Sequence, residues 1–164
     1  MVLIDGKKVS AEIRDRLKQE TEELKEKTGR TPGLATVLVG DDPASAVYVR
    51  NKNKICNELG FQSFGKNLPE QTTEAELMSL INDLNGNDEV NGILVQLPLP
   101  NHIDSEKILL SIDPEKDVDG FHPINVGKLA IGNALLTPCT PTGVIALLDY
   151  YGIEISGKHA VVLG

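Results

Sequence analysis

Hydrophobic residues follow two alternating patterns along the first hundred positions. Apolar residues spaced three or four apart predict helices at about 9–28, 43–59 and 77–84. Between them lie short apolar runs typical of strands, at about 34–39, 61–66 and 92–96. Strands joined by helices of this length run parallel, and nearly continuous apolar strands are covered on both faces. The pattern predicts an α/β fold with a mostly parallel sheet flanked by helices, in three layers (α/β/α).

The pattern is more irregular after residue 100. A short helix is expected at about 104–111, and clustered Asp, Gly and Pro predict an ordered loop over 113–123. A Pro-rich turn at 137–143 precedes a helix that ends near Gly152, and a new strand is expected at 159–164. We therefore expect a first domain over 1–140. Residues 141–164 are expected to be the first helix and strand of a truncated, Rossmann-like dinucleotide-binding domain, although a strand followed by one glycine is a weak signal.

One lysine lies on the apolar side of the helix predicted at 43–59. Asp42 can cap this helix, Pro43 suits its first position and Gly60 can end it. The expected apolar stripe contains Ala44, Val47, Tyr48, Ile55, Cys56 and Leu59, whereas the expected solvated face contains Arg50, Asn53, Lys54 and Asn57. Lys52 falls inside the stripe, beside Ser45. Such a lysine either extends its ammonium group to water or takes part in chemistry, and with Tyr48 one turn away it forms a candidate acid–base group.

A glutamine ends the strand predicted at 92–96. Ligands of parallel sheets gather beyond the carboxyl ends of the strands, and Gln96 occupies that end, just before a Leu-Pro-Leu-Pro segment that cannot continue a central strand. The helix with Lys52 begins at the same edge, since it follows the strand at 34–39 after only three residues. We therefore expect Gln96 and Lys52 to meet.

Composition limits the classes of partner. The 164 residues include 16 Lys and Arg against 24 Asp and Glu, with no long basic run, which argues against nucleic acid. Cys56 and Cys139 have no Cys-x-x-Cys pattern and are expected to be reduced thiols in a cytosolic protein. The carboxylates of 113–123 do not have calcium-loop spacing, so no metal site is expected. Neither a signal peptide nor a membrane span is expected, and the chain is predicted to be soluble.

Four motifs occur in order along the chain: Ser45-x-x-Tyr48-x-x-x-Lys52-x-Lys54, Val95-Gln96-Leu97-Pro98-Leu99-Pro100, Pro114-Glu115-Lys116-Asp117-Val118-Asp119-Gly120 and Pro138-Cys139-Thr140-Pro141-x-Gly143. Together they resemble the bifunctional methylenetetrahydrofolate dehydrogenase/methenyltetrahydrofolate cyclohydrolase family. The resemblance implies oxidation of 5,10-methylenetetrahydrofolate with NADP, or with NAD in some members, and hydrolysis of the methenyl product to 10-formyltetrahydrofolate. It also implies one-carbon metabolism that supplies purine biosynthesis, a cytoplasmic location, and a homodimer of the full-length protein.

The resemblance also assigns roles to particular residues. Lys52 would be the catalytic lysine, Tyr48 would contact the folate near the reacting carbon, and Gln96 would hold the lysine. Asp119 would pair with polar edges of the pterin ring. The pocket wall would include Ser45, Leu97 and Pro98. The NADP-binding region is expected to be absent from this chain, so no residue is assigned to the cofactor.

Two other interpretations were considered. Short-chain dehydrogenases share the Tyr-x-x-x-Lys spacing, but they carry a glycine-rich nucleotide loop near the N-terminus and reach the pair much later in the chain. Tyr48 comes too early and follows no such loop. The second alternative stays open: a folate-binding or interaction module without turnover, because half of the expected cleft is missing.

Overall fold

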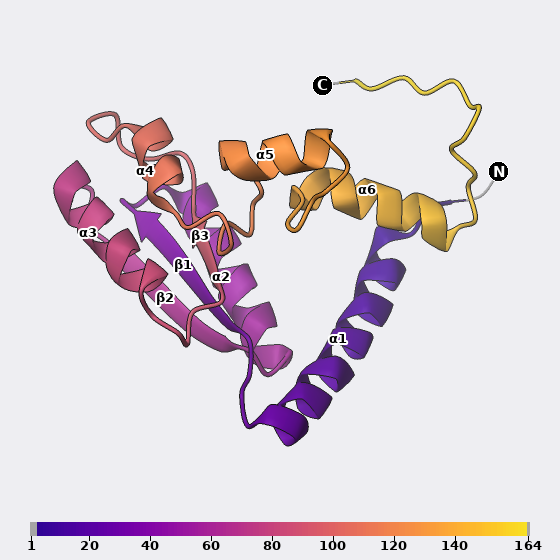
Figure 1. Cartoon of the computed structure of the whole chain (residues 1–164), viewed down its shortest axis with the longest axis horizontal. Coiled ribbons are helices and arrows are strands. Elements are labelled where there is room, and N and C mark those ends of the chain that lie inside the picture. Colours follow the sequence, from indigo (N-terminus) through magenta and orange to yellow (C-terminus); the bar gives the residue numbers. More distant parts are fainter. Residues whose placement is uncertain (1–2, 164) are drawn as a thin grey trace.

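The computed structural model of the chain describes residues 3–163, which are built around a three-stranded parallel sheet (Figure 1). The strands are β1 (Gly33–Val39), β2 (Gln62–Leu68) and β3 (Gly92–Val95), in the order β2-β1-β3. The central strand β1 pairs with β2 from Gly33↔Gln62 to Val39↔Leu68, and with β3 from Leu34↔Gly92 to Val37↔Val95. The carboxyl ends of all three strands therefore share one edge, and the prediction of a parallel sheet is confirmed.

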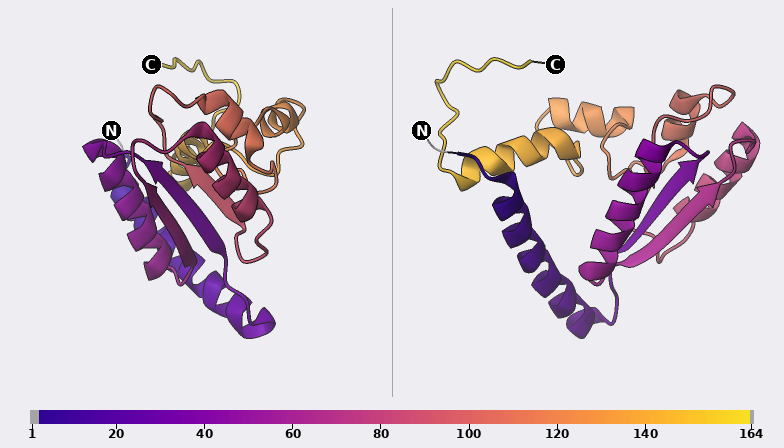
Figure 2. Two further views of the ribbon diagram at one scale, coloured as in Figure 1. Left: turned by 90° about the vertical axis from the view of Figure 1, so that its left-hand side faces the viewer. Right: turned by 180° about the vertical axis from the view of Figure 1, so that it is seen from behind.

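Helices cover both faces of this sheet. Helix α2 (Pro43–Glu58) contacts β1 and β2 on one face, while α3 (Glu74–Asn85) and α4 (Ser105–Ser111) belong to the core on the other. The view from behind shows α2 and α3 on opposite sides of the strands (Figure 2, right). The core on the α3 side contains Ala35, Val37, Val39, Leu77, Ile81, Leu84, Val90, Ile93, Val95, Leu99, Ile103, Ile108 and Ile112. The predicted three-layer arrangement is confirmed.

The first and last helices meet away from the sheet. Helix α1 (Gly6–Thr28) runs from beside the amino ends of the strands to α6 (Cys139–Tyr150) (Figure 1). The hydroxyl of Tyr150 donates a hydrogen bond to Glu12 Oε1 (2.8 Å), and the hydroxyl of Tyr151 accepts one from the backbone N–H of Asp5 (3.0 Å). Asp5 also caps α1, which therefore begins three residues before the predicted position 9.

Helix α5 (Pro123–Ala130) was not predicted from the sequence, which had indicated no element between the loop over 113–123 and the turn at 137–143. Its start has recognisable signals, because Pro123 takes the first position and His122 Nδ1 accepts a hydrogen bond from the backbone N–H of Ile124 (3.2 Å). Helix α6 begins at Cys139, so part of the turn expected at 137–143 is helical.

The strand expected at 159–164 does not form over 159–163, and Gly164 lies outside the described residues. The side chain of Val162 is 93% exposed and this segment pairs with no other strand among residues 3–163. A strand is stable only when its N–H and C=O groups find a neighbour, which explains why an apolar sequence alone did not produce one here. The expected first strand of a Rossmann-like unit is therefore wrong for these residues.

Gly33 is expected to be intolerant of a side chain. A Cβ atom at this position would collide with the backbone carbonyl oxygen of Glu89, which cannot move away as a flexible side chain could. Gly33→Ala should therefore lower the free energy of unfolding by about 1–3 kcal/mol in a urea titration. Gly127→Ala is the control, because a Cβ there meets nothing within 4 Å and lies within α5. Equal stability of the two variants would contradict the expectation.

Candidate functional site

Helix α2 carries Lys52 to the carboxyl edge of the sheet. The helix begins where Pro43 takes its first turn and Asp42 accepts a hydrogen bond from the backbone N–H of Ser45 (2.7 Å). It gives way to Gly60, whose φ of 79° suits glycine. These bounds agree with the prediction. Because α2 follows β1 after a three-residue turn, its first two turns lie near the ends of the strands.

The face of α2 that is buried differs from the predicted stripe. Ser45, Val49, Cys56 and Leu59 are buried, whereas Ala44, Val47 and Tyr48 are exposed. Asn53, expected in solvent, is half-buried and accepts hydrogen bonds from Thr36 Oγ1 (2.8 Å) and Ser63 Oγ (3.3 Å). The prediction was wrong because these hydroxyl groups on the sheet need partners, and the Asn53 amide supplies one. Lys52 consequently lies at the boundary of the buried face and is half-buried.

Lys52 and Gln96 meet, as predicted. Lys52 Nζ donates a hydrogen bond to Gln96 Oε1 (3.2 Å). The backbone N–H of Gln96 bonds to Val37 O (2.9 Å), which places the residue just beyond β3 in register with β1. Its Nε2 donates to Leu97 O (2.8 Å), so the amide is oriented with its oxygen toward the lysine.

Asp119 is the third charged or polar group at this site. It is half-buried, burial raises the pKa of its carboxyl, and the nearby positive charge of Lys52 opposes that rise. The following residue, Gly120, has a φ of 68°, and a Cβ there would come within 3.0 Å of Pro138 N. This close approach, which only glycine permits, brings the loop of Asp119 against the start of α6.

Cys139 completes the same site and was not identified as a site residue from the sequence. Its Sγ lies 3.7 Å from Val118 O, as a weak hydrogen-bond donor. Burial raises the pKa of the Cys139 thiol, the charge of Asp119 acts in the same direction, and Lys52 opposes both. Its position in the motif Pro138-Cys139-Thr140-Pro141-x-Gly143 could have indicated a site residue. The sequence prediction for Cys139 was only that of a reduced thiol outside any disulfide or metal site.

The other predicted site residues are Tyr48, Ser45, Leu97 and Pro98, and among them the backbone carbonyl of Leu97 accepts the hydrogen bond from Gln96 Nε2. Tyr48 is 62% exposed one turn before Lys52, and among residues 3–163 no hydrogen bond joins its hydroxyl to another side chain. Ser45 is buried at the start of α2. Leu97 and Pro98 follow Gln96 and are exposed. The structure thus joins Lys52 and Gln96 by a hydrogen bond, places Asp119 within reach of the charge of Lys52, and leaves the other four residues around them.

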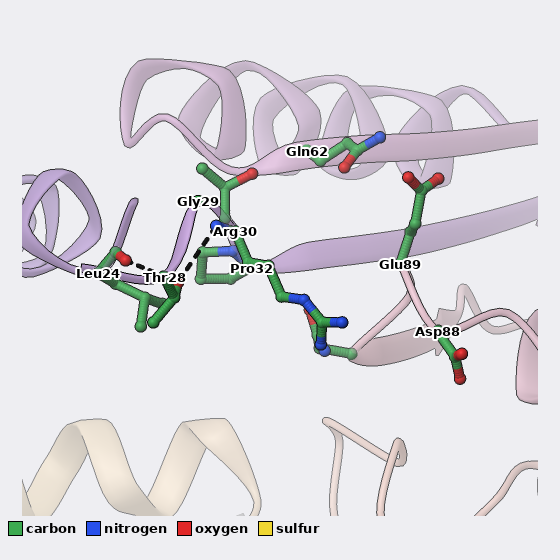
Figure 3. A pocket seen from close by; sticks show the side chains of 10 residues that line it. Leu24, Thr28, Gly29, Arg30, Pro32, Gln62, Asp88 and Glu89 are labelled. Carbon is green, nitrogen blue, oxygen red and sulfur yellow. Dashed lines mark hydrogen bonds between the residues drawn. The ribbon is translucent and has the colours of Figure 1, made fainter. Parts of the chain in front are cut away.

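A separate hollow of about 600 Å³ lies at the opposite edge of the sheet (Figure 3). Its walls come from the end of α1 and from residues beside the amino ends of the strands, including Pro32, Gln62 and Asn91. The side chains of Arg30 and Glu89 extend in different directions around it. Since Gln96 and Lys52 are at the carboxyl ends, this hollow is not part of their site.

Two further kinds of feature are absent from residues 3–163. No group of three or more His, Cys, Asp and Glu side chains within residues 3–163 is placed to hold a metal ion. In the same range, no helix combines the length and apolar character needed to cross a membrane.

The raised pKa of the Asp119 carboxyl should make its contribution to stability more favourable at acid pH than at neutral pH. Because the pKa of its carboxyl is higher when folded, the folded state binds the proton more tightly; this stabilisation is complete below the ordinary value of 3.8 and is lost as pH rises through the raised value. Asp119→Asn, which stays neutral, should therefore melt about 1–3 °C higher than the unsubstituted chain at pH 7, after allowance for solvent screening. Melting at pH 3.5 should show no such gain.

The exposed Asp83 on α3 provides the control for this titration. Asp83→Asn should change the melting temperature by less than about 1 °C at pH 7, as expected for a substitution at the surface. A lower melting temperature for Asp119→Asn at pH 7 would show that its attraction to Lys52 outweighs its burial.

Comparison with known proteins places these residues in a family. The sequence profile described as tetrahydrofolate dehydrogenase/cyclohydrolase, catalytic domain, matches residues 4–119. The chain belongs to this family. The bifunctional protein FolD of Streptococcus gordonii is 56% identical over 162 residues, which make up 99% of this chain and 57% of that protein.

Solved structures of tetrahydrofolate dehydrogenase/cyclohydrolases have the same fold. The bifunctional FolD of Campylobacter jejuni superposes with a TM-score of 0.93 at 53% identity, covering 96% of this chain and 56% of that one. The Trypanosoma brucei enzyme, solved with NADP and an inhibitor, superposes with a TM-score of 0.92 at 41% identity, covering 96% and 54%. The chain thus spans little more than half the length of these relatives.

Proposed function

We propose that this chain carries the folate site of a methylenetetrahydrofolate dehydrogenase/methenyltetrahydrofolate cyclohydrolase, together with the residues that hydrolyse the methenyl group. One observation carries the proposal: the hydrogen bond from Lys52 Nζ to Gln96 Oε1 (3.2 Å) at the carboxyl edge of the sheet. Burial raises the pKa of the Asp119 carboxyl at the same site, and the positive charge of Lys52 opposes that rise. An amine held by an amide beside a carboxyl can accept, store and return a proton, which the hydrolysis requires.

The proposed hydrolysis adds water to a cationic amidinium carbon. The water oxygen bonds to this carbon while Lys52 accepts one of its protons. The bond from the carbon to N5 then breaks, N5 takes a proton, the formyl group stays on N10, and one proton is released overall. A bound cation beside Lys52 favours the neutral amine, because two positive charges oppose each other.

The surrounding residues would bind and orient the folate. Asp119 is suited to adjacent N–H donors on a pterin edge, since a carboxylate accepts two hydrogen bonds. The exposed ring of Tyr48 offers a face for stacking near the reacting carbon. We assign the pocket wall to Ser45, Leu97 and Pro98. Gln96 acts on the lysine by fixing its position.

The hydride-transfer half is proposed only for the complete protein, with NADP as the cofactor bound by the Trypanosoma brucei relative. The residues present do not fit a dinucleotide: the sequence contains no G-x-G-x-x-G, and 153–163 form no strand that could lead into such a turn. We accordingly propose that residues 1–140 are the folate-binding catalytic domain and 141–164 the beginning of the dinucleotide-binding domain.

The proposal extends to the cellular setting. Two free cysteines, one buried and one exposed at the site, support a reducing compartment, for which we propose the cytoplasm. A homodimer of the complete protein and a role in supplying one-carbon units for purine biosynthesis rest on the resemblance of the four motifs to the family.

Turnover by the chain itself tests this proposal. The chain is incubated with 5,10-methenyltetrahydrofolate, and hydrolysis is followed through loss of the methenyl chromophore. A rate above that of buffer alone is expected. Calorimetric binding of the folate without turnover would favour the alternative of a folate-binding module. Neither binding nor turnover would contradict the proposed function of this chain.

A further inference from the structure

A buried carboxylate lies two residues before Asp119. The side chain of Asp117 is only 3% exposed, and its Oδ2 accepts two hydrogen bonds, from the backbone N–H of His122 (2.8 Å) and from Asn125 Nδ2 (3.0 Å). Asn125, 1% exposed, also donates to Pro114 O (2.8 Å). Asp117 therefore joins the loop that bears Asp119 to the first turn of α5.

The same loop is fixed to the sheet and to α3 on its other side. The backbone N–H of Ile93 bonds to Lys116 O (2.7 Å), in a parallel bridge beside β3. Lys116 Nζ donates to the carbonyl oxygens of Asn85 (2.7 Å) and Asn87 (2.9 Å) at the end of α3, where carbonyl groups lack helical partners. Lys116 thus fixes the backbone immediately before Asp117, which lies two residues before Asp119.

The hydrogen bonds that join Asp117, His122 and Asn125 keep polar side chains buried, which lowers stability unless every polar atom has a partner. Asn125 Oδ1 is buried and has no hydrogen-bond partner among residues 3–163, and no ion pair neutralises Asp117 in the same part of the chain. Buried polar groups of this kind are retained where they hold a geometry that an apolar core would not specify.

We propose that Asp117 is a positioning residue, which holds the loop that bears Asp119 in place by accepting hydrogen bonds from His122 and Asn125. The inference rests on the proposed function, because it concerns the folate-binding role of Asp119. Asp117 also acts through its charge, which raises the pKa of Asp119 less than burial does. The charged and titratable groups that face Asp119 are Lys52 from α2, Cys139 from α6 and Asp117 from its own loop.

Alkylation of Cys139 reports on this loop without any folate. Its thiol contacts Val118 O, and burial, together with the charge of Asp119, raises its pKa, so release of the loop should expose the thiol and accelerate its reaction with iodoacetamide. Peptide mass spectrometry separates Cys139 from the buried Cys56. Circular dichroism establishes that each variant is folded.

Three substitutions distinguish hydrogen bonding from charge. Asp117→Asn keeps an oxygen that can accept both bonds, and should react within about twofold of the unsubstituted chain. Asp117→Ala removes the acceptor and should accelerate alkylation by about tenfold and weaken methenyltetrahydrofolate binding by a similar factor. Should Asp117→Ala fail to fold, Asn125→Ala removes one donor and should give a smaller change in the same direction. The exposed Glu115 supplies the control, Glu115→Ala.

Two results would overturn the inference. One is unchanged alkylation in folded Asp117→Ala or Asn125→Ala. The other is equal acceleration in Asp117→Asn and Asp117→Ala, which would assign the effect to charge. If the unsubstituted chain binds no folate, the proposed function fails, yet the alkylation rates still decide whether Asp117 holds the loop.

Discussion

Lys52→Met is expected to reduce hydrolysis of 5,10-methenyltetrahydrofolate by about 10²–10⁴-fold, the range typical of losing a proton-transfer group. Methionine retains the length of the side chain and its contact with the boundary of the buried face of α2, but it can neither donate to Gln96 nor exchange a proton with water. Folate binding should change much less than turnover, because Tyr48 and Asp119 remain. Chromophore loss gives the rate, and calorimetry gives the affinity.

Lys54→Met is the matched control for this experiment. Lys54 lies on the same helix but is exposed and pairs with Glu58 across 3.7 Å, an interaction contributing little at the surface. Its replacement should leave the hydrolysis rate within about twofold of the original, as expected for a surface site away from the reacting atoms. Equal rates for Lys52→Met and the unsubstituted chain would remove the lysine from the mechanism.

Ile93→Ala should have the largest effect on stability. Its side chain is fully buried in the core between the sheet and α3, and deletion leaves a cavity that neighbours fill only partly. We expect the free energy of unfolding to fall by about 2–5 kcal/mol, measured by urea titration monitored with circular dichroism. This is a large part of the total stability of an ordinary domain.

Ile131→Ala tests whether burial is the cause. Ile131 is 78% exposed after the end of α5, so removing the same atoms there should change the free energy of unfolding by no more than about 0.5 kcal/mol. A loss at Ile131 as large as that at Ile93 would mean that this exposed residue is covered in solution.

The sheet was predictable because its signals are local. The apolar run at 34–39 and the one at 92–96 each fit a buried strand, and helices long enough for a crossover required them to be parallel. The meeting of Lys52 with Gln96 followed from the rule that the ends of parallel strands share an edge. Neither inference needed knowledge of distant side chains.

The missed features depend on contacts between distant parts of the chain. Hydrophobic periodicity placed Tyr48 on the buried face of α2, but the Thr36 hydroxyl on β1 turned Asn53 inward instead. Proximity of Cys139 to Asp119 depends on Gly120 meeting Pro138, which no local pattern reveals. The segment at 159–163 shows the converse, because strand-forming residues without a neighbouring strand remain extended and unpaired.

The contact between α1 and α6 joins parts of the chain that are far apart in sequence. The hydrogen bond from Tyr150 to Glu12 joins residues 138 positions apart, so it closes a loop containing most of the chain. Such a closure forms late, after the local strand–helix–strand steps have shortened the distance between its ends. Helix α6 also begins with Cys139, whose Sγ lies 3.7 Å from Val118 O in the loop of Asp119, so this contact needs the chain as far as residue 139. The sheet needs only residues 33–95, whereas the packing of α6 beside the loop of Asp119 depends on residues more than forty positions further along the chain.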